Sequence, residues 1–166
     1  MTATYDKIDK YTVTGSNLLG TTGVTFTSIP STYTDLVLVQ DTTLTAAAIA
    51  FLQVNSDTGS NYSRTTLSGN GSSAASSRQS SQTQISTDVV HMTSTRGTYI
   101  SNFQNYSNST TFKTVLIRNN NTAFGTEATA GLWRNTAAIT SIKCYLDRAE
   151  SYVVGSTFTL YGIKAE

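Results

Sequence analysis

Cysteine, histidine, proline and charged residues are all scarce in this chain of 166 residues. A single cysteine, Cys144, excludes an intrachain disulfide. Charged residues make up 13% of the chain, against roughly 25% in ordinary domains. The net charge is +1, and the lysines and arginines form no cluster of the kind that binds nucleic acids. The sequence therefore predicts no nucleic-acid partner.

Long apolar segments are also missing. The longest apolar run covers residues 46–52, whereas a membrane-spanning helix needs about 20 apolar residues. The first residues do not combine a charged start with an apolar stretch, as a secretory signal would. We therefore predict no membrane partner, and a chain that is made and folded in a cytoplasm.

Serine, threonine, asparagine and glycine take the place of the missing charges. Threonine is β-branched and suits a pleated surface, while serine, asparagine and glycine suit turns. The 9 Tyr, 6 Phe and 1 Trp are more aromatic residues than a disordered chain would carry. The length suits one folded domain over residues 1–166.

Alternation of apolar and polar residues predicts about ten strands joined by polar turns. The expected strands cover residues 8–13, 24–29, 36–39, 49–54, 62–67, 85–92, 99–104, 112–118, 128–133, 139–146 and 157–163. The expected turns include residues 55–61, 105–109 and 119–122, which are rich in Asn, Ser, Asp and Gly. No amphipathic helix of ten or more residues stands out, so the strands should pair antiparallel.

These elements predict an all-β fold, an antiparallel two-sheet β-sandwich. A jelly-roll-like arrangement fits the chain length and the strand count. An immunoglobulin-like sandwich is the alternative, although it usually has fewer strands and about 100 residues. Residues 69–81 form a low-complexity Ser/Gly/Ala stretch with nothing to bury, which predicts a long exposed loop.

The residues needed for nucleophilic catalysis are few. His91 is the only histidine, so it would have to act as the base, and it lies within an expected strand. The chain lacks the Gly-x-Ser-x-Gly elbow of many hydrolases. Cys144 also lies in an expected strand, where a free cysteine is usually a small buried apolar residue. The prediction is a protein that is not an enzyme; a small hydrolase is the outlying alternative.

Calcium binding and sugar binding are two possible activities, and each has a simpler structural explanation. Asn55, Asp57, Gly59 and Asn61 resemble part of a calcium loop, but Thr66 stands where a bidentate Glu is needed. A turn held by side-chain hydrogen bonds explains the same residues. Trp133 and the tyrosines could stack on a sugar, yet aromatics at strand spacing are more often core. No cofactor and no metal are predicted.

Several stretches of the chain resemble small virion structural proteins of tailed bacteriophages, many of them from marine or cyanobacterial hosts. The resemblance covers nearly the whole sequence. It is carried by residues 5–8, 29–39, 55–63, 67–71, 131–134 and 155–165. It implies a structural component of the virion, assembled in the host cytoplasm, and it supplies no catalytic residues.

Within that group, the leading expectation is a capsid decoration, or cement, protein that stabilises the head lattice. It would bind the major capsid protein or other virion proteins and form a homo-oligomer, with a trimer favoured. Tyr5, Ile8 and Tyr11 are the candidate interface residues. They fit either an N-terminal arm over residues 2–11 or a first sheet strand, and the sequence does not separate the two.

The alternative expectation is a tail or fibre module that binds host-surface glycans. It would use loop aromatics together with the Ser/Gly-rich stretch. Gly69, Asn70, Gly71 and Arg78 are the candidate contact residues there.

Overall fold

The chain folds into antiparallel β-sheets, seen in a computed structural model that describes residues 4–87 and 93–164. All regular elements within these ranges are strands. They are β1 (Tyr5–Thr12), β2 (Leu18–Leu19), β3 (Val24–Phe26), β4 (Asp35–Thr42), β5 (Ala50–Val54), β6 (Tyr62–Gly69), β7 (Ala74–Gln82), β8 (Ile85–Ser86), β9 (Gly97–Gln104), β10 (Lys113–Asn121), β11 (Gly125–Trp133), β12 (Ile142–Leu146), β13 (Ser151–Tyr152) and β14 (Thr157–Ile163).

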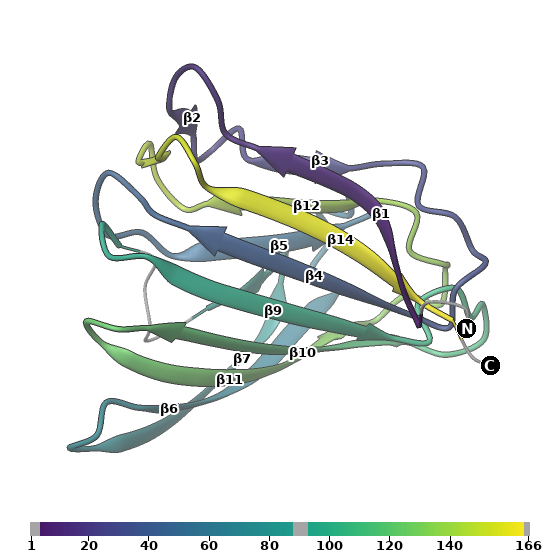
Figure 1. Cartoon of the computed structure of the whole chain (residues 1–166). Coiled ribbons are helices and arrows are strands. Elements are labelled where there is room, and N and C mark those ends of the chain that lie inside the picture. Colours follow the sequence, from purple (N-terminus) through teal and green to yellow (C-terminus); the bar gives the residue numbers. More distant parts are fainter. Residues whose placement is uncertain (1–3, 88–92, 165–166) are drawn as a thin grey trace.

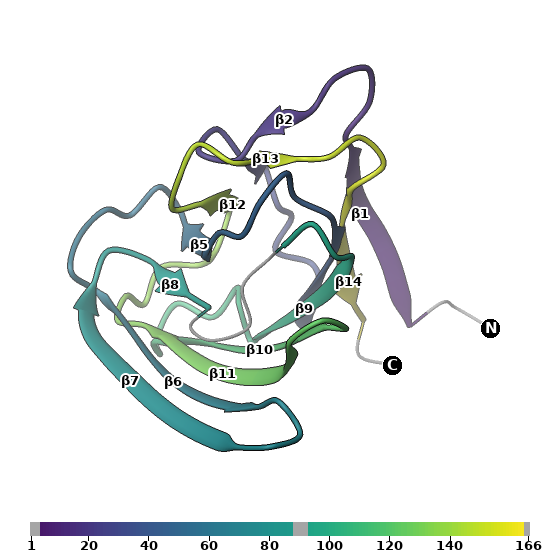
Figure 2. The same ribbon diagram turned by 90° about the vertical axis from the view of Figure 1, so that its left-hand side faces the viewer.

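The strands form one large sheet, one smaller sheet and a short ribbon (Figure 1). The large sheet has eight strands in the order β1-β14-β4-β9-β10-β11-β6-β7. The smaller sheet has four, in the order β3-β12-β5-β8, and β2 pairs with β13. Figure 2 shows the large sheet curving around the smaller one. The first and last strands lie side by side, with Tyr11 opposite Phe158.

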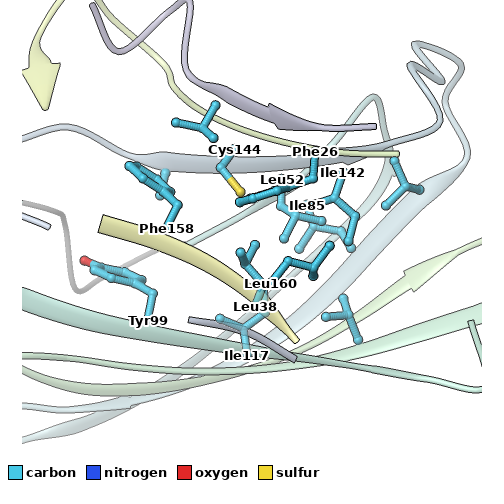
Figure 3. Close-up of a cluster of buried hydrophobic side chains, with 14 of the residues drawn as sticks. Phe26, Leu38, Leu52, Ile85, Tyr99, Ile117, Ile142, Cys144, Phe158 and Leu160 are labelled. Carbon is cyan, nitrogen blue, oxygen red and sulfur yellow. The ribbon is translucent and has the colours of Figure 1, made fainter. Parts of the chain in front are cut away.

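The core lies between the two sheets and is built mostly by alternate residues of the strands that face each other (Figure 3). The large sheet contributes Leu38, Ile117 and Leu160, each at most 4% exposed. Phe26 and Ile142 meet them from the smaller sheet, at most 2% exposed. Burial of such side chains contributes about 1.5–3 kcal/mol each before the entropy of folding is counted.

The predicted fold class is confirmed: the protein is an all-β, antiparallel sandwich of two sheets. The prediction of about ten strands falls short of the fourteen found in the described residues. Four of these, β2, β3, β8 and β13, have only two or three residues. The strands that the sequence did not predict are β2 and β13, which are too short to give a periodic signal, and the nine-residue β7.

The prediction of a long exposed loop over residues 69–81 is wrong in its structure. Only residues 70–73 form a turn, and β7 then pairs with β6 from Ala74 to Gln82. Most β7 side chains are exposed, as the composition indicated. A strand at a sheet edge is held by its backbone ladder on one side, so it forms here without apolar residues of its own.

The predicted turn at residues 119–122 is also displaced, because β10 continues to Asn121. Asn119 and Asn121 are buried on the inner face of the sheet, 3% and 2% exposed. The Asn121 side chain donates a hydrogen bond to Thr93 Oγ1 at 2.9 Å and accepts one from the Ala123 N–H. Pairing with strands on both sides overrides the turn preference of asparagine here.

The predicted turn between β5 and β6 is present and is organised by Asp57. One carboxylate oxygen accepts from Trp133 Nε1 at 2.6 Å and from Asn61 Nδ2 at 2.8 Å; the other accepts from the Gly59 N–H at 2.8 Å. Burial alone would raise the pKa of Asp57, but these hydrogen bonds outweigh it and hold the pKa below its usual value of 3.8. The carboxylate therefore ties the turn to the end of β11.

Replacing this carboxylate tests its contribution to folding. We expect Asp57→Asn to lower the free energy of unfolding by about 1–2 kcal/mol at neutral pH, since hydrogen bonds to the charged form are lost. Because the folded-state pKa is lowered, the stabilisation is complete well above pH 3.8 and declines as pH falls through the folded pKa. Urea unfolding followed by Trp133 fluorescence should therefore show a difference between the two proteins that shrinks in acid.

Asp9→Asn is the matched control, because Asp9 is an exposed carboxylate on β1. It should change stability by less than about 0.5 kcal/mol at neutral pH. An Asp57→Asn difference that stays constant from neutral to acid pH would contradict the role given to the charge.

Candidate interaction surface

The first set of predicted interface residues lies on β1, which is an edge of the large sheet. Tyr5 and Tyr11 are 56% and 40% exposed, while Ile8 is half-buried and packs against the core. Tyr5 contacts Tyr161, and Tyr11 contacts Phe158, each in an edge-to-face arrangement with ring centroids 6.4 Å apart. Of the two alternatives for this segment, the described residues from Tyr5 onward form a sheet strand.

The second predicted set lies on the hairpin that joins β6 to β7. The side-chain oxygen of Asn70 accepts from the backbone N–H groups of Ser72 and Ser73 at 3.0 and 2.8 Å. Gly71 has a φ of 85°, which glycine adopts without strain. These contacts end β6 at Gly69 and turn the chain into β7, where Arg78 is exposed.

The structure does not bring the two sets together. The strands β1 and β7 are the opposite edges of the large sheet, with six strands between them. Tyr5 and Tyr11 therefore lie at one edge, and Asn70 and Arg78 at the other (Figure 2). The outer face of the sheet extends from one of these edges to the other.

The outer face carries a band of mostly apolar side chains across six strands. Cross-strand pairing places twelve residues in two adjacent rows of this band. The first row is Tyr161, Val37, Asn102, Leu116, Ala130 and Thr65; the second is Thr159, Val39, Ile100, Arg118, Ala128 and Leu67. We call these twelve residues the outer band.

The outer band is less charged than a surface that only meets water. Arg118 is the single charged residue among its twelve, whereas about 25–35% of a soluble protein surface is usually charged. Leu67 and Leu116 are 61% and 48% exposed, whereas Val37 and Thr159, toward the β1 edge, are buried at 5% and 8% exposed. Apolar residues gathered on one exposed face mark an interaction site more often than scattered ones do.

The charged residues along the two rows of the outer band have one sign, whereas Asp35 and Asp41 of β4 lie in the rows on either side of it. The two rows continue into β1 at Lys7 and Lys10 and, in the first row, into β7 at Arg78. Together with Arg118 these are four cations, and the rows hold no aspartate or glutamate. A partner that fits this face would present apolar side chains with acidic groups around them.

Leu67 and Leu116 were not among the predicted contact residues, although their place in the alternating pattern marks them as outward-facing. Both leucines occupy the polar phase of their strands, next to inward-facing Thr66 and Ile117. In a strand, a large apolar residue in the outward phase faces solvent unless something covers it. The alternating pattern therefore predicts that both leucines face outward, once the inward-facing residues of each strand are known.

The inner face of the same sheet carries a row of buried polar side chains toward β6 and β11. Arg64 donates to Thr66 Oγ1 at 2.7 Å, Thr66 and Thr129 share a hydrogen bond of 2.9 Å, and Thr129 donates to Glu127 at 2.9 Å. All four residues are at most 4% exposed. The two hydroxyls thus link a buried guanidinium to a buried carboxylate across the pair of strands, which offsets the cost of burying both charges.

The other chemical candidates have structural explanations or lie outside the described residues. Cys144 is 1% exposed, and burial raises the pKa of its thiol to about 12, so the thiol is protonated at neutral pH. Trp133 is 2% exposed and stacks on Tyr62, which places it in the core as the spacing favoured. Both oxygens of Asp57 accept hydrogen bonds within its turn. His91 lies outside the described residues.

Comparison with known proteins identified no relative of this chain. No family model matches the chain, and a search of curated proteins returns no significant match. Within residues 4–87 and 93–164, no helix has the length and apolar character needed to cross a membrane.

The buried polar row allows a test that separates hydrogen bonding from packing. Thr129→Val preserves the shape of the side chain but removes the hydroxyl, which leaves Thr66 and Glu127 each without one hydrogen-bond partner. We expect the free energy of unfolding to fall by about 1–3 kcal/mol, as measured by urea denaturation.

Thr65→Val is the matched control, because Thr65 is the exposed residue beside Thr66 on the same strand. It should change stability by no more than about 0.5 kcal/mol. Equal losses from the two variants would show that the row adds nothing beyond strand propensity.

Proposed function

We propose that this protein is a structural component of a tailed-phage virion, and in particular a capsid decoration protein that stabilises the head lattice. The observation that carries the proposal is the outer band, with one charge among twelve residues on a sheet face. Such a face is suited to a protein neighbour rather than to free solution. The resemblance to virion structural proteins supplies the assembly in which that neighbour would be found.

In this proposal the major capsid protein, or another virion protein, covers the outer band. Leu116 and Leu67 supply exposed apolar area. Arg118 follows Leu116 on β10, in the row that holds Leu67, where it can pair with an acidic residue of the partner. The hydrogen-bonded sheet behind these side chains is rigid, so little conformational entropy is lost when the face is covered. The protein acts by binding and bracing, without a chemical step, and it resides in the virion after assembly in the host cytoplasm.

A second candidate function is a tail or fibre module that binds host-surface glycans. It is favoured by an open cleft at the tips of two hairpins, where Asn70, Asn120 and Phe124 line one hollow. Phe124 is 52% exposed. An exposed aromatic ring beside amide groups can stack on a sugar and bind its hydroxyls. Binding on a glycan array that is lost in Phe124→Ala would support this function over the first.

The decoration role predicts both abundance and dependence on the outer band. Particles of the phage that carries this gene should contain the protein in hundreds of copies, as quantified by mass spectrometry of purified virions. We expect Leu116→Asp to reduce that copy number at least about tenfold, because a buried, unpaired carboxylate would then face the partner. The folded protein itself should be stable, since position 116 is 48% exposed.

Leu19→Asp provides the matched control. Leu19 is 44% exposed but lies on β2, away from the large sheet. It should leave the copy number unchanged. A wild-type copy number in the tens or below would refute the decoration role, and equal incorporation of both variants would refute the role of the outer band.

A further inference from the structure

The strand β7 ends the large sheet with an open edge. It is nine residues long, and it pairs with β6 on one side only, within the part of the chain that the structure describes. Figure 2 shows it as the outermost strand, at the opposite end of the sheet from β1. Pairing with β6 is regular from Ala74 to Gln79, and an irregularity follows before Gln82. The backbone groups on the far side of this regular stretch are available to another strand.

The two edges of the sheet differ in how they are protected. The edge strand β1 has a bulge between Lys7 and Asp9 and carries four charged residues, Asp6, Lys7, Asp9 and Lys10. Bulges and charges are the usual means of preventing unwanted strand pairing. The regular part of β7 has neither a bulge nor a proline, and its one charged residue is Arg78. One edge is therefore blocked and the other is left open to pairing.

We propose that β7 pairs antiparallel with β7 of a second copy of this chain, around a two-fold axis at Ser76. The resulting dimer has one continuous sheet of sixteen strands, eight from each copy. In this register Ser76 lies opposite Ser76 of the second copy, and Ala74 lies opposite Arg78. The small side chains at the axis allow close approach of the two backbones, and paired hydroxyls can bond across it.

Charge and the length of the regular stretch favour this register. Opposite residues in an antiparallel pair share a face, so the two-fold axis lies midway between one residue and its own copy. An axis at Ala74 or Ala75 would pair fewer residues of the regular stretch Ala74–Gln79. An axis at Arg78 would place two guanidinium groups directly opposite each other, which destabilises the pair. An axis at Ser77 would leave them diagonal neighbours, about 7–8 Å apart. With the axis at Ser76 they are four residues out of register, or about 14 Å apart along the strand.

Self-pairing also fits the chemistry of the strand better than pairing with a charged partner. The regular stretch of β7 contains alanine, serine and glutamine besides Arg78, so it offers no apolar anchor or charge pattern for a specific foreign peptide. Because both copies use the same edge, the interface is two-fold symmetric and forms a closed dimer. The blocked β1 edges are then the outermost strands of the joined sheet. It differs from the trimer expected from the resemblance, and it does not depend on the outer band.

Sedimentation velocity of the purified full chain tests the pairing. The wild-type protein should show reversible formation of a species of twice 17.8 kDa as concentration rises through the micromolar range. We expect Ser76→Lys to weaken dimerisation at least about tenfold, because two ammonium groups then face each other at the axis. Thr12→Lys, an exposed substitution on the opposite edge strand, should leave dimerisation unchanged.

Cross-linking tests the register itself. Under mild oxidation Ser76→Cys should form a covalent dimer on a non-reducing gel, since residues opposite each other in a ladder are close enough for a disulfide. Cys144 is buried and should remain unreacted in the folded protein, and Thr12→Cys should form no covalent dimer on the same gel. A wild-type protein that is monomeric or trimeric at every concentration, or a dimer insensitive to Ser76→Lys, would overturn the proposal.

Discussion

The constraint on which this structure depends is that a sheet of eight strands must bury one face, while the sheet that covers it has only four strands. Around β4, β9 and β14 the smaller sheet covers the inner face, and most large inward side chains are leucine, phenylalanine and tyrosine, with Gln40, Thr42 and Ser101 buried among them. Toward β6 and β11 the inward residues become Arg64, Thr66, Glu127 and Thr129. At β7 both faces are largely exposed, and the strand is held mainly by its backbone ladder with β6, together with hydrogen bonds to the side chains of Ser77 and Gln79. The change from apolar to polar residues follows the extent of the cover.

That gradient explains which parts of the fold the sequence could predict. Where the cover is complete, apolar residues mark the strands, as a continuous run at residues 36–39 and as an alternating pattern at residues 99–104, and both segments are strands in the structure. Where the cover ends, burial no longer selects apolar residues and the periodic signal disappears. For that reason the sequence predicts a loop where β7 forms, and a turn at the asparagines that end β10. Backbone pairing determines both segments, and no local pattern of residue types records it.

The candidate surface was only partly predictable for a related reason. Tyr5, Tyr11, Asn70 and Arg78 were chosen for their residue type, and the structure places them at the two edges of one sheet. The outer band between them depends on the register of six strands, so it could not be assembled from any single segment. Leu67 and Leu116 become neighbours of the same band only through β11, where Ala128 and Ala130 lie between them. A surface of this kind can be recognised only when the register of the whole sheet is known.

The lone thiol of Cys144 gives the molecule a built-in reporter. It is 1% exposed at the centre of the smaller sheet, and it lies opposite Val24 on one side and Leu52 on the other. A thiol reagent can reach it only when these strands separate, so the rate of modification measures how often the sandwich opens. Because the chain has no second cysteine, that rate can be assigned to one place. The scarcity of cysteine thus makes the opening of the core directly measurable by simple chemical kinetics.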